Sequence, residues 1–425
     1  MITTGLAAPV RHPIAGNLFA DPDSSVITCG NDRNRFYFGE GTKYTSVRAS
    51  TATYLSSNGY LATAAVNESR FDYDPLDSSS LSSGGWLFED GKTNFVQRSA
   101  NFGHSYWTKT GCTVTDNTVT APDGTLAMDT IVEDGTTGAH GVSRSLSVTN
   151  ANRYAISCWA DDINRDWLRI AIADGATTRE AWFNVSTGAV GTVNNCDYAF
   201  IQGPYRDGRY RCHIQVTING GTASRSTSFN AADADASNSF TGGTQDSLYI
   251  WGAQLEVDHL TSYIPTAGSQ VSRSQDQSTL SLSALNTSHF DLYLEMDLLF
   301  APNMDGQLLT PITTTVGANG EQWTLIKLAT NQMTHNITDD TGALRFNNFS
   351  FPVGDYGEKI GVTVRWNNEN TGPDNIKMTS DGAVMPYVST ANAGTEQWTA
   401  VPATLQFWDL SRSTAMKLRT LVVGI

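Results

Sequence analysis

The sequence predicts an all-β protein in which two antiparallel, jelly-roll-like β-sandwiches follow an extended N-terminal attachment region. Two observations support this fold class. Short apolar segments such as Ala155 to Ala160 and Lys359 to Trp366 alternate with Gly, Asn and Asp turn residues, and no helical pattern separates them. The chain has 425 residues, which exceeds one ordinary core and indicates two or three domains.

Residues 1–92 are expected to form the attachment region. Turn dipeptides such as Asp21-Pro22 and the aromatic patch Phe36-Tyr37-Phe38 are typical of an extended arm with some β-structure. Residues 93–272 are expected to form the first sandwich, because five apolar segments recur there between turn residues. These segments are Ala155–Ala160, Trp167–Ala173, Ala181–Val185, Tyr210–Ile218 and Leu248–Leu255.

Residues 273–425 are expected to form the second sandwich. The polar stretch from Ser272 to Thr279 has no apolar anchor and is interpreted as a linker between the two units. A second series of strand-like segments follows: Phe290–Phe300, Gln322–Ala329, Lys359–Trp366, Asn375–Thr379 and Lys417–Val423. No heptad run is present, so no coiled-coil shaft is expected.

Charge and hydropathy restrict the partners. The formal net charge is −15 at pH 7, which repels the phosphates of nucleic acid, so no nucleic-acid partner is expected. The N-terminal residues lack the charged and then apolar segments of a secretory signal, which predicts synthesis in a cytoplasm. No apolar run approaches the roughly 20 residues that span a bilayer, and membrane insertion is therefore not expected.

Cysteine and histidine spacing does not indicate a metal centre. The five cysteines are odd in number and have no CxxC pair, so buried free thiols are expected rather than disulfides or a zinc site. The seven histidines stand singly, and none occurs in HxH or HExxH spacing. No cofactor is expected. Paired acids such as Asp161-Asp162 are more typical of turns than of a glycosidase acid and base or of calcium ligands, and calcium binding stays open.

Several segments carry a family resemblance. The run RFDYDPLDSSSLSSGGWLFEDGKTNFVQR extends from Arg70 to Arg98, and Trp107, APDGT at Ala121 to Thr125 and WGAQLEVDHLTSYIPTAGSQ at Trp251 to Gln270 follow it. Together they resemble a module of phage tail-fibre, head-fibre and other appendage proteins, in which such phrases frame a carbohydrate-binding-like β-sandwich. The match covers about Ser50 to Arg273.

This resemblance implies a context more than a reaction. The departures from the family phrase GLLIEExRTNL include Trp86, Phe88, Asp90 and Lys92, and Lys92 keeps the charge of the arginine that it replaces. The resemblance implies a virion protein that is assembled in the host cytoplasm and released by lysis. It also implies other virion proteins as partners and a homotrimer, because family members serve in threefold appendages.

The C-terminal segment carries a second resemblance. The order KIGVTVRWNNENTGPDNIKMTSDGAVM, with a strand that ends in Trp366 and a hairpin that closes at Asp381-Gly382, is similar to the concanavalin A-like, laminin-G-type jelly roll. It implies a sandwich for residues 273–425. The segment from Leu418 to Val423 is expected to return to the first strand of this sandwich.

Strand alternation predicts a glycan-binding face in the first sandwich. When apolar residues such as Ile156 and Leu168 face the core, their neighbours face outward and place three tryptophans with planar polar groups on one sheet face. The candidates are Trp159, Trp167, Arg169, Trp182, Asn184, Arg211, His213 and Gln215. Flat aromatic rings and planar hydrogen-bonding groups suit a pyranose. The alternative is that the opposing sheet or a neighbouring subunit covers these tryptophans.

A catalytic role has less support. Glu295 and Asp297 lie at alternate positions of one expected strand, where two carboxylates reach the separation of a retaining glycosidase. Phe300 stands where an ExDxxE pattern would place its second Glu, so no catalytic residue is assigned and the protein is expected not to be an enzyme.

The functional expectation is a phage virion structural protein. A tail-fibre, head-fibre or spike subunit that engages host-surface glycans is expected first. A capsid decoration or tail-adaptor protein without a ligand is the alternative, and a polysaccharide depolymerase is the second alternative.

Overall fold

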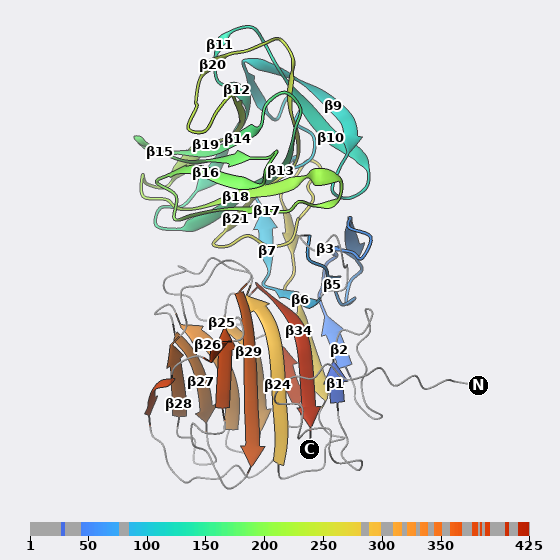
Figure 1. The fold of residues 1–425 in the computed structure, drawn as a ribbon, viewed down its shortest axis with the longest axis vertical. Helices are drawn as coiled ribbons and strands as arrows, with labels where there is room; N and C mark the ends of the chain where they lie inside the picture. The colour runs from blue at the N-terminus through green and yellow to red at the C-terminus, as the bar shows by residue number, and fades with distance from the viewer. Residues whose placement is uncertain are drawn as a thin grey trace, which may run out of the picture.

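The computed structural model describes residues 27–29, 44–75 and 85–281 and the strands between residues 289 and 424, with side chains for 45–75 and 85–279 (Figure 1). The described residues contain β-strands and one 3-10 turn at Arg206–Gly208, and they contain no α-helix. The predicted all-β fold with antiparallel sandwiches is confirmed. The described part of the chain has no helix that is long and apolar enough to cross a membrane.

The first sandwich packs two six-stranded antiparallel sheets. One sheet has the order β17-β18-β13-β21-β10-β9, and the other has the order β16-β15-β14-β19-β12-β8. The strands are β8 Thr108–Thr110, β9 Cys112–Thr120, β10 Leu126–Glu133, β12 His140–Val148, β13 Arg153–Asp162, β14 Trp167–Asp174, β15 Thr177–Asn184, β16 Ala189–Asn194, β17 Tyr198–Gln202, β18 Tyr210–Thr217, β19 Ala223–Ala232 and β21 Asp246–Val257. A short pair, β11 Thr137–Gly138 with β20 Phe240–Thr241, stands apart.

The core of this sandwich lies between its two sheets. It contains Ile156 and Cys158 from one sheet and Leu168, Ile170 and Phe183 from the other, all of them inaccessible to solvent. The inward and outward alternation that the sequence predicts along these strands is therefore confirmed. Burial of such apolar side chains on facing sheets is the main stabilising contribution in a sandwich.

The second sandwich contains two eight-stranded sheets, drawn below the first in Figure 1. Its C-terminal strands are β23 Gln277–Ser281, β24 His289–Leu298, β25 Leu309–Val316, β26 Glu321–Leu328, β27 Gln332–Thr338, β28 Leu344–Ser350, β29 Glu358–Asn367, β30 Ile376–Ser380, β31 Ala383–Val384, β32 Tyr387–Ala391, β33 Thr404–Phe407 and β34 Ala415–Gly424. The predicted return of the C-terminal strand is confirmed, because β34 pairs with β24 and places Val423 opposite Leu292.

Strands from the predicted attachment region belong to the sheets of the second sandwich. They are β1 Ile27–Cys29, β2 Tyr44–Val47, β5 Phe71–Asp72 and β6 Gly85–Glu89. β1 and β6 both pair with β34, β5 pairs with β6, and β2 pairs with β23. The first sandwich is thus inserted between two strands of the second, and attachment of residues 1–92 to other proteins stays a prediction.

The chain enters and leaves the first sandwich through a two-stranded neck. β7 (Lys92–Asn94) leads in, β22 (Val271–Arg273) leads out, and the two pair antiparallel. The predicted boundaries at residues 92/93 and 272/273 fall in these strands. The predicted linker from Ser272 to Thr279 is polar, as expected, but it is not a loose connection, since Arg273 and Asp276 in it are buried.

A small hairpin lies beside the neck. β3 (Ala52–Leu55) pairs with β4 (Leu61–Ala64), and Leu55 packs in a second apolar cluster with Trp159 and Trp251 of the first sandwich. The hairpin therefore covers apolar side chains on the outer face of the first sandwich.

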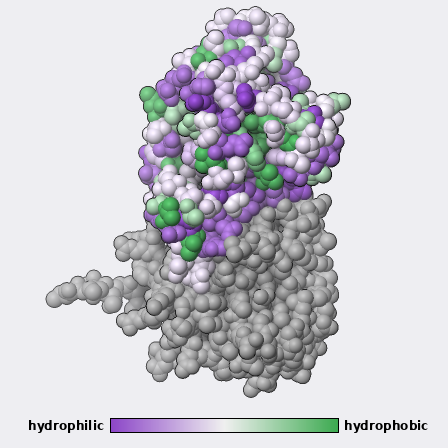
Figure 2. All heavy atoms as spheres, turned by 180° about the vertical axis from the view of Figure 1, so that it is seen from behind, coloured by the Kyte–Doolittle hydropathy of each residue, from purple (hydrophilic) through white to green (hydrophobic). Residues whose placement is uncertain are grey.

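On the face drawn in Figure 2, apolar side chains form small separate groups among polar ones over the first sandwich.

Candidate functional site

A network of buried charges lies directly below the neck. Three arginines, Arg48, Arg70 and Arg273, surround two carboxylates, Glu89 and Asp276, and each of these side chains is at most 5 % exposed. Buried ions are costly unless they are paired and hydrogen-bonded, and here every one has an oppositely charged neighbour. The network is therefore a specific structural feature and not an accident of the surface.

Asp276 is the centre of the network. Its Oδ1 accepts a hydrogen bond from Nη1 of Arg48 at 2.8 Å, and its Oδ2 accepts from Nη2 of Arg70. The backbone N–H of Glu89 also donates to Oδ2, at 3.0 Å. Arg48 follows β2, Glu89 ends β6 and Asp276 precedes β23, so this carboxylate joins three strand ends of the second sandwich.

Glu89 joins the network to the first sandwich. Its Oε1 accepts from the N–H of Ser262 at 2.7 Å and its Oε2 from the hydroxyl of Ser262 at 2.6 Å, and Ser262 lies in the loop that follows β21. Burial raises the pKa of Glu89, but the charges of Arg273 and Arg70 and the bonds from Ser262 outweigh it and lower the pKa to about 2. Glu89 is therefore ionised at neutral pH. Its carboxylate connects the two sandwiches by contacting Arg70 and Arg273 on one side and Ser262 on the other.

A second charged group flanks the neck. His259 places Nε2 3.1 Å from Asp90 and Nδ1 3.1 Å from Asp258, and Lys92 lies 2.9 Å from Asp90. Burial and the Lys92 charge lower the pKa of His259, but Asp90 and Asp258 outweigh them and raise it to about 9. The imidazolium form thus links Asp90, just before the first neck strand, to the loop after β21.

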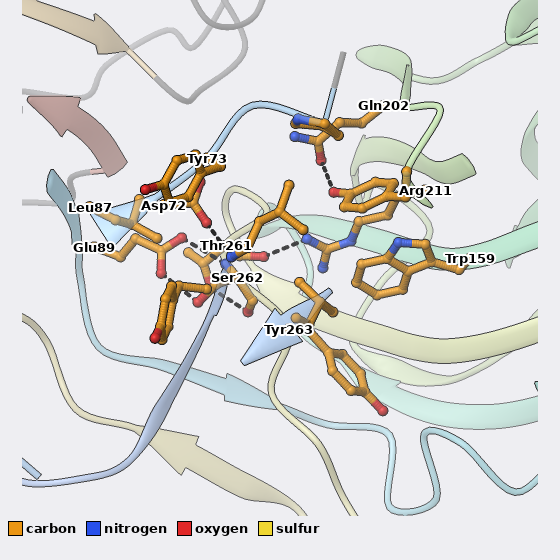
Figure 3. Close-up of a pocket in the computed structure, with 15 residues that line it drawn as sticks. Asp72, Tyr73, Leu87, Glu89, Trp159, Gln202, Arg211, Thr261, Ser262 and Tyr263 are labelled. Atoms are coloured by element: carbon orange, nitrogen blue, oxygen red, sulfur yellow. Dashed lines mark hydrogen bonds between the residues drawn. The ribbon is translucent and has the colours of Figure 1, made fainter. Parts of the chain in front are cut away.

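A cavity of about 60 Å³ opens between the β3–β4 hairpin, strands β5 and β6 and the first sandwich (Figure 3). Aromatic and polar side chains share its wall, and the lining residues are Tyr54, Leu55, Leu61, Asp72, Tyr73, Pro75, Leu87, Glu89, Trp159, Gln202, Tyr205, Arg211, Thr261, Ser262 and Tyr263. In Figure 3 the guanidinium of Arg211 lies beside Trp159 and is directed toward Thr261. The cavity combines a buried cation with flat apolar surfaces.

The predicted glycan-binding residues do not share one face. Trp159, Arg211, His213 and Gln215 lie on β13 and β18, whereas Trp167, Arg169, Trp182 and Asn184 lie on β14 and β15. These strand pairs belong to different sheets with the core between them, so the two groups lie on opposite outer faces. The prediction of a single face is wrong, because alternation separates inward from outward positions but does not assign a strand to a sheet.

The first group is covered by the protein itself. Trp159 is 1 % exposed and contacts the rings of Tyr205, Trp251 and Tyr263. Gln215 donates to the carbonyl oxygen of Asp258 at 2.7 Å. His213 is also buried, and burial together with the Arg211 charge lowers its pKa to about 3.

The second group is partly covered. Trp182 is 1 % exposed, and its Nε1 donates to the carbonyl oxygen of Ser237 at 2.9 Å. Arg169 forms an ion pair with Glu180. Trp167 and Asn184 are half-buried. The cover over Trp159 and Trp182 therefore comes from other strands and loops of the same chain and not from the opposing sheet. Glycan binding by these eight residues stays a prediction.

Other sequence-based expectations have different outcomes. Cys112, Cys158, Cys196 and Cys212 are free thiols as expected, but only Cys158 and Cys212 are buried, whereas Cys112 and Cys196 are half-buried. The side chain of the fifth cysteine, Cys29, lies outside the described residues. Among the described side chains, no group of three or more His, Cys, Asp or Glu residues is placed to hold a metal ion. Glu295 and Asp297 lie on β24, opposite Gly361 and Lys359, but their side chains lie outside the described residues, so the hydrolase alternative is untested.

Sequence reasoning missed the charge network. Arg70 and Glu89 stand within the family-like segment, which was a signal that these charges belong to a framework. Arg48 and Asp276 gave no comparable signal, because charged residues ordinarily lie on the surface. No protein-family model matches the chain, and no curated protein matches it.

Proposed function

We propose that this chain is a rigid structural subunit of a phage virion appendage: a tail fibre, head fibre or spike. The observation that carries the proposal is the buried charge network at the neck. It ties strand ends of the second sandwich to the Ser262 loop of the first through Glu89 and Asp276. An appendage subunit must keep a fixed orientation between its parts, and a joint of this kind provides it.

The contacts within the neck are those expected of a rigid joint. Two chain connections run side by side, and Nη2 of Arg273 donates to the carbonyl oxygen of Asp90 across them at 2.6 Å. Removing one partner from a buried ion pair typically costs about 3 to 5 kcal/mol, because the remaining charge is left uncompensated. Bending at the neck would break the hydrogen bonds that join Ser262 to Arg70 and Glu89. It would also break the contact of His259 with Asp90, so one orientation is strongly preferred.

The family-like segments support the virion context. They extend from about Ser50 to Arg273, and residues within them, Arg70, Glu89 and Ser262, build the joint. Assembly into a homotrimer with other virion proteins as neighbours belongs to the proposal, as does assembly in the host cytoplasm. A capsid decoration or tail-adaptor role uses the same rigid joint and differs only in position on the particle.

Glycan engagement is the second function that we propose, and the cavity of Figure 3 favours it. The cavity carries aromatic rings and hydrogen-bonding groups together, which is the wall composition of many small-ligand sites.

A cryo-EM map of intact particles tests the structural role. We expect density for this chain in a fibre or spike, with the two sandwiches in one fixed orientation. Copies tiled over the capsid would favour the decoration alternative, and absence of the chain from purified particles would refute the virion role.

A further inference from the structure

We propose that the cavity of Figure 3 binds the carboxylate of an acidic sugar, and that Arg211 is the residue that holds it. The inference deepens the glycan-binding part of the proposed function by naming the ligand class. It does not depend on where the chain sits in the particle.

Arg211 is a buried cation with unused hydrogen-bonding capacity. It is 5 % exposed, and no described carboxylate lies within ion-pair distance of it. Its Nη1 donates to the carbonyl oxygen of Thr261 at 2.9 Å, while Nε and Nη2 have no hydrogen-bond partner among the described residues. Buried polar groups are nearly always paired, so two orphaned donors beside a cavity indicate a missing acceptor.

The two orphaned donors have the geometry that a carboxylate requires. Nε–H and one N–H of Nη2 lie parallel on one edge of a guanidinium and fit the two oxygens of a carboxylate. The same edge is used elsewhere in this protein. Nε and Nη2 of Arg165 donate to the two carboxylate oxygens of Glu133 at 3.0 and 2.7 Å. Arg211 carries this arrangement without an internal carboxylate.

The aromatic wall favours a sugar over a simple acid. The guanidinium of Arg211 lies 4.3 Å above the Trp159 ring, and this contact fixes the plane of its donors. A volume of about 60 Å³ admits a carboxylate group or a few waters but not a whole pyranose. The sugar ring would therefore remain at the rim, beside the half-buried Tyr54 and Leu61.

The carboxylates in the wall do not oppose an anionic ligand strongly. Glu89 is compensated by Arg70 and Arg273, and Oδ1 of Asp72 accepts the N–H of Leu55 at 2.6 Å. The positive charge of Arg211 is therefore not paired with any described carboxylate and is available to an anionic ligand in the cavity.

Titration of the purified full-length chain with D-glucuronate, D-glucose and acetate tests the assignment. We expect saturable binding of glucuronate, no binding of glucose, which lacks the carboxylate, and much weaker binding of acetate. Arg211→Lys keeps the charge but removes the paired donors, and it should weaken glucuronate binding about tenfold. Arg206→Lys is the matched control, because Arg206 also lies over an aromatic ring, that of Tyr60, but does not line the cavity.

The outcomes are distinct. Equal binding of glucuronate and glucose, no saturable binding of glucuronate, or unchanged affinity in a folded Arg211→Lys variant would overturn the proposal. Acetate that binds as tightly as glucuronate would overturn the assignment to a sugar. If Arg211→Lys does not fold, a crystal structure of the unaltered chain with glucuronate decides, because the carboxylate must lie within hydrogen-bonding distance of Nε and Nη2. The particle map can fail while this binding test succeeds, and the reverse also holds.

Discussion

Nη1 of Arg48 donates to Oδ1 of Asp276 at 2.8 Å, although 228 positions separate the two residues in the chain. This contact joins the end of β2 to the start of β23, on either side of the inserted first sandwich. Because Asp276 also accepts from Arg70 and from the backbone of Glu89, one carboxylate holds segments that precede and follow the insertion. The network is therefore built mainly from the second sandwich, and Glu89 connects it to the first through Ser262.

Asp276→Asn should destabilise the protein by about 3 to 5 kcal/mol, since it leaves Arg48 and Arg70 buried without one of their carboxylates. Denaturant-induced unfolding, followed by circular dichroism, measures the change. Asp197→Asn is the matched control, because Asp197 pairs with Arg153 at 3.8 Å and both side chains are partly exposed. That control should cost no more than about 1 kcal/mol. Equal effects of the two substitutions would contradict the importance of the network.

Stability should fall as the pH rises from about 6.5 to 9. The pKa of His259 is raised to about 9, above the unfolded value near 6.5, so the folded state binds the proton more tightly. Its contribution is fully present below the unfolded pKa and is lost as the pH passes the folded pKa. The free energy of unfolding measured between pH 6 and 10 should therefore decline more steeply in the unaltered chain than in His259→Gln. Parallel pH profiles would show that His259 does not stabilise the neck as an imidazolium.

Gly252→Ala should destabilise the protein by more than about 2 kcal/mol. Gly252 has φ of +68°, which favours glycine, and an added Cβ would lie 2.6 Å from Cε3 of Trp159. Gly138→Ala is the control, because its φ is not positive and a Cβ there meets no heavy atom within 4 Å. Thermal unfolding of both variants measures the difference, and a stable Gly252→Ala variant would contradict the close approach of backbone and indole.

In a Cys29→Ser variant, the four thiols whose side chains the structure describes should react slowly with a thiolate-specific reagent at pH 8. Burial raises the pKa of Cys112 to about 11 and that of Cys196 to about 12, and Cys158 and Cys212 are inaccessible to solvent. The reaction of the folded chain with Ellman's reagent should therefore be slow and should accelerate on unfolding. Rapid reaction of these four thiols in the folded chain would disagree with their positions in the structure.

Local sequence patterns predicted the strands well, because the alternation of apolar and polar residues indicates which side chains of a strand face the core. Ile156 and Cys158 face the core as the pattern requires, and β34 returns to β24 as expected. Alternation could not reveal that β13 and β14, neighbours in the chain, lie in different sheets, and this separates Trp159 from Trp182. Strand pairing depends on contacts far apart in sequence, which local patterns do not contain.

The charge network and the cavity were not predictable in the same way. A polar stretch such as Ser272 to Thr279 resembles a linker, since charges are ordinarily solvated. Burial of Asp276 is favourable only because Arg48 and Arg70, which precede the first sandwich in the sequence, pair with it in the folded chain. Arg211 was a sequence-based candidate, but its orphaned donors and its contact with Trp159 became visible only in the folded chain.

Rigidity at the neck is the central claim, and a distance measurement between the two sandwiches tests it most directly. Spin labels would be placed at Val47→Cys in β2 and Val193→Cys in β16, two exposed positions on different units, with Cys29→Ser to limit background labelling. Pulsed electron double resonance should give one narrow distance distribution, and adding Asp276→Asn should broaden it. A broad or multiple distribution with the charge network intact would contradict the account.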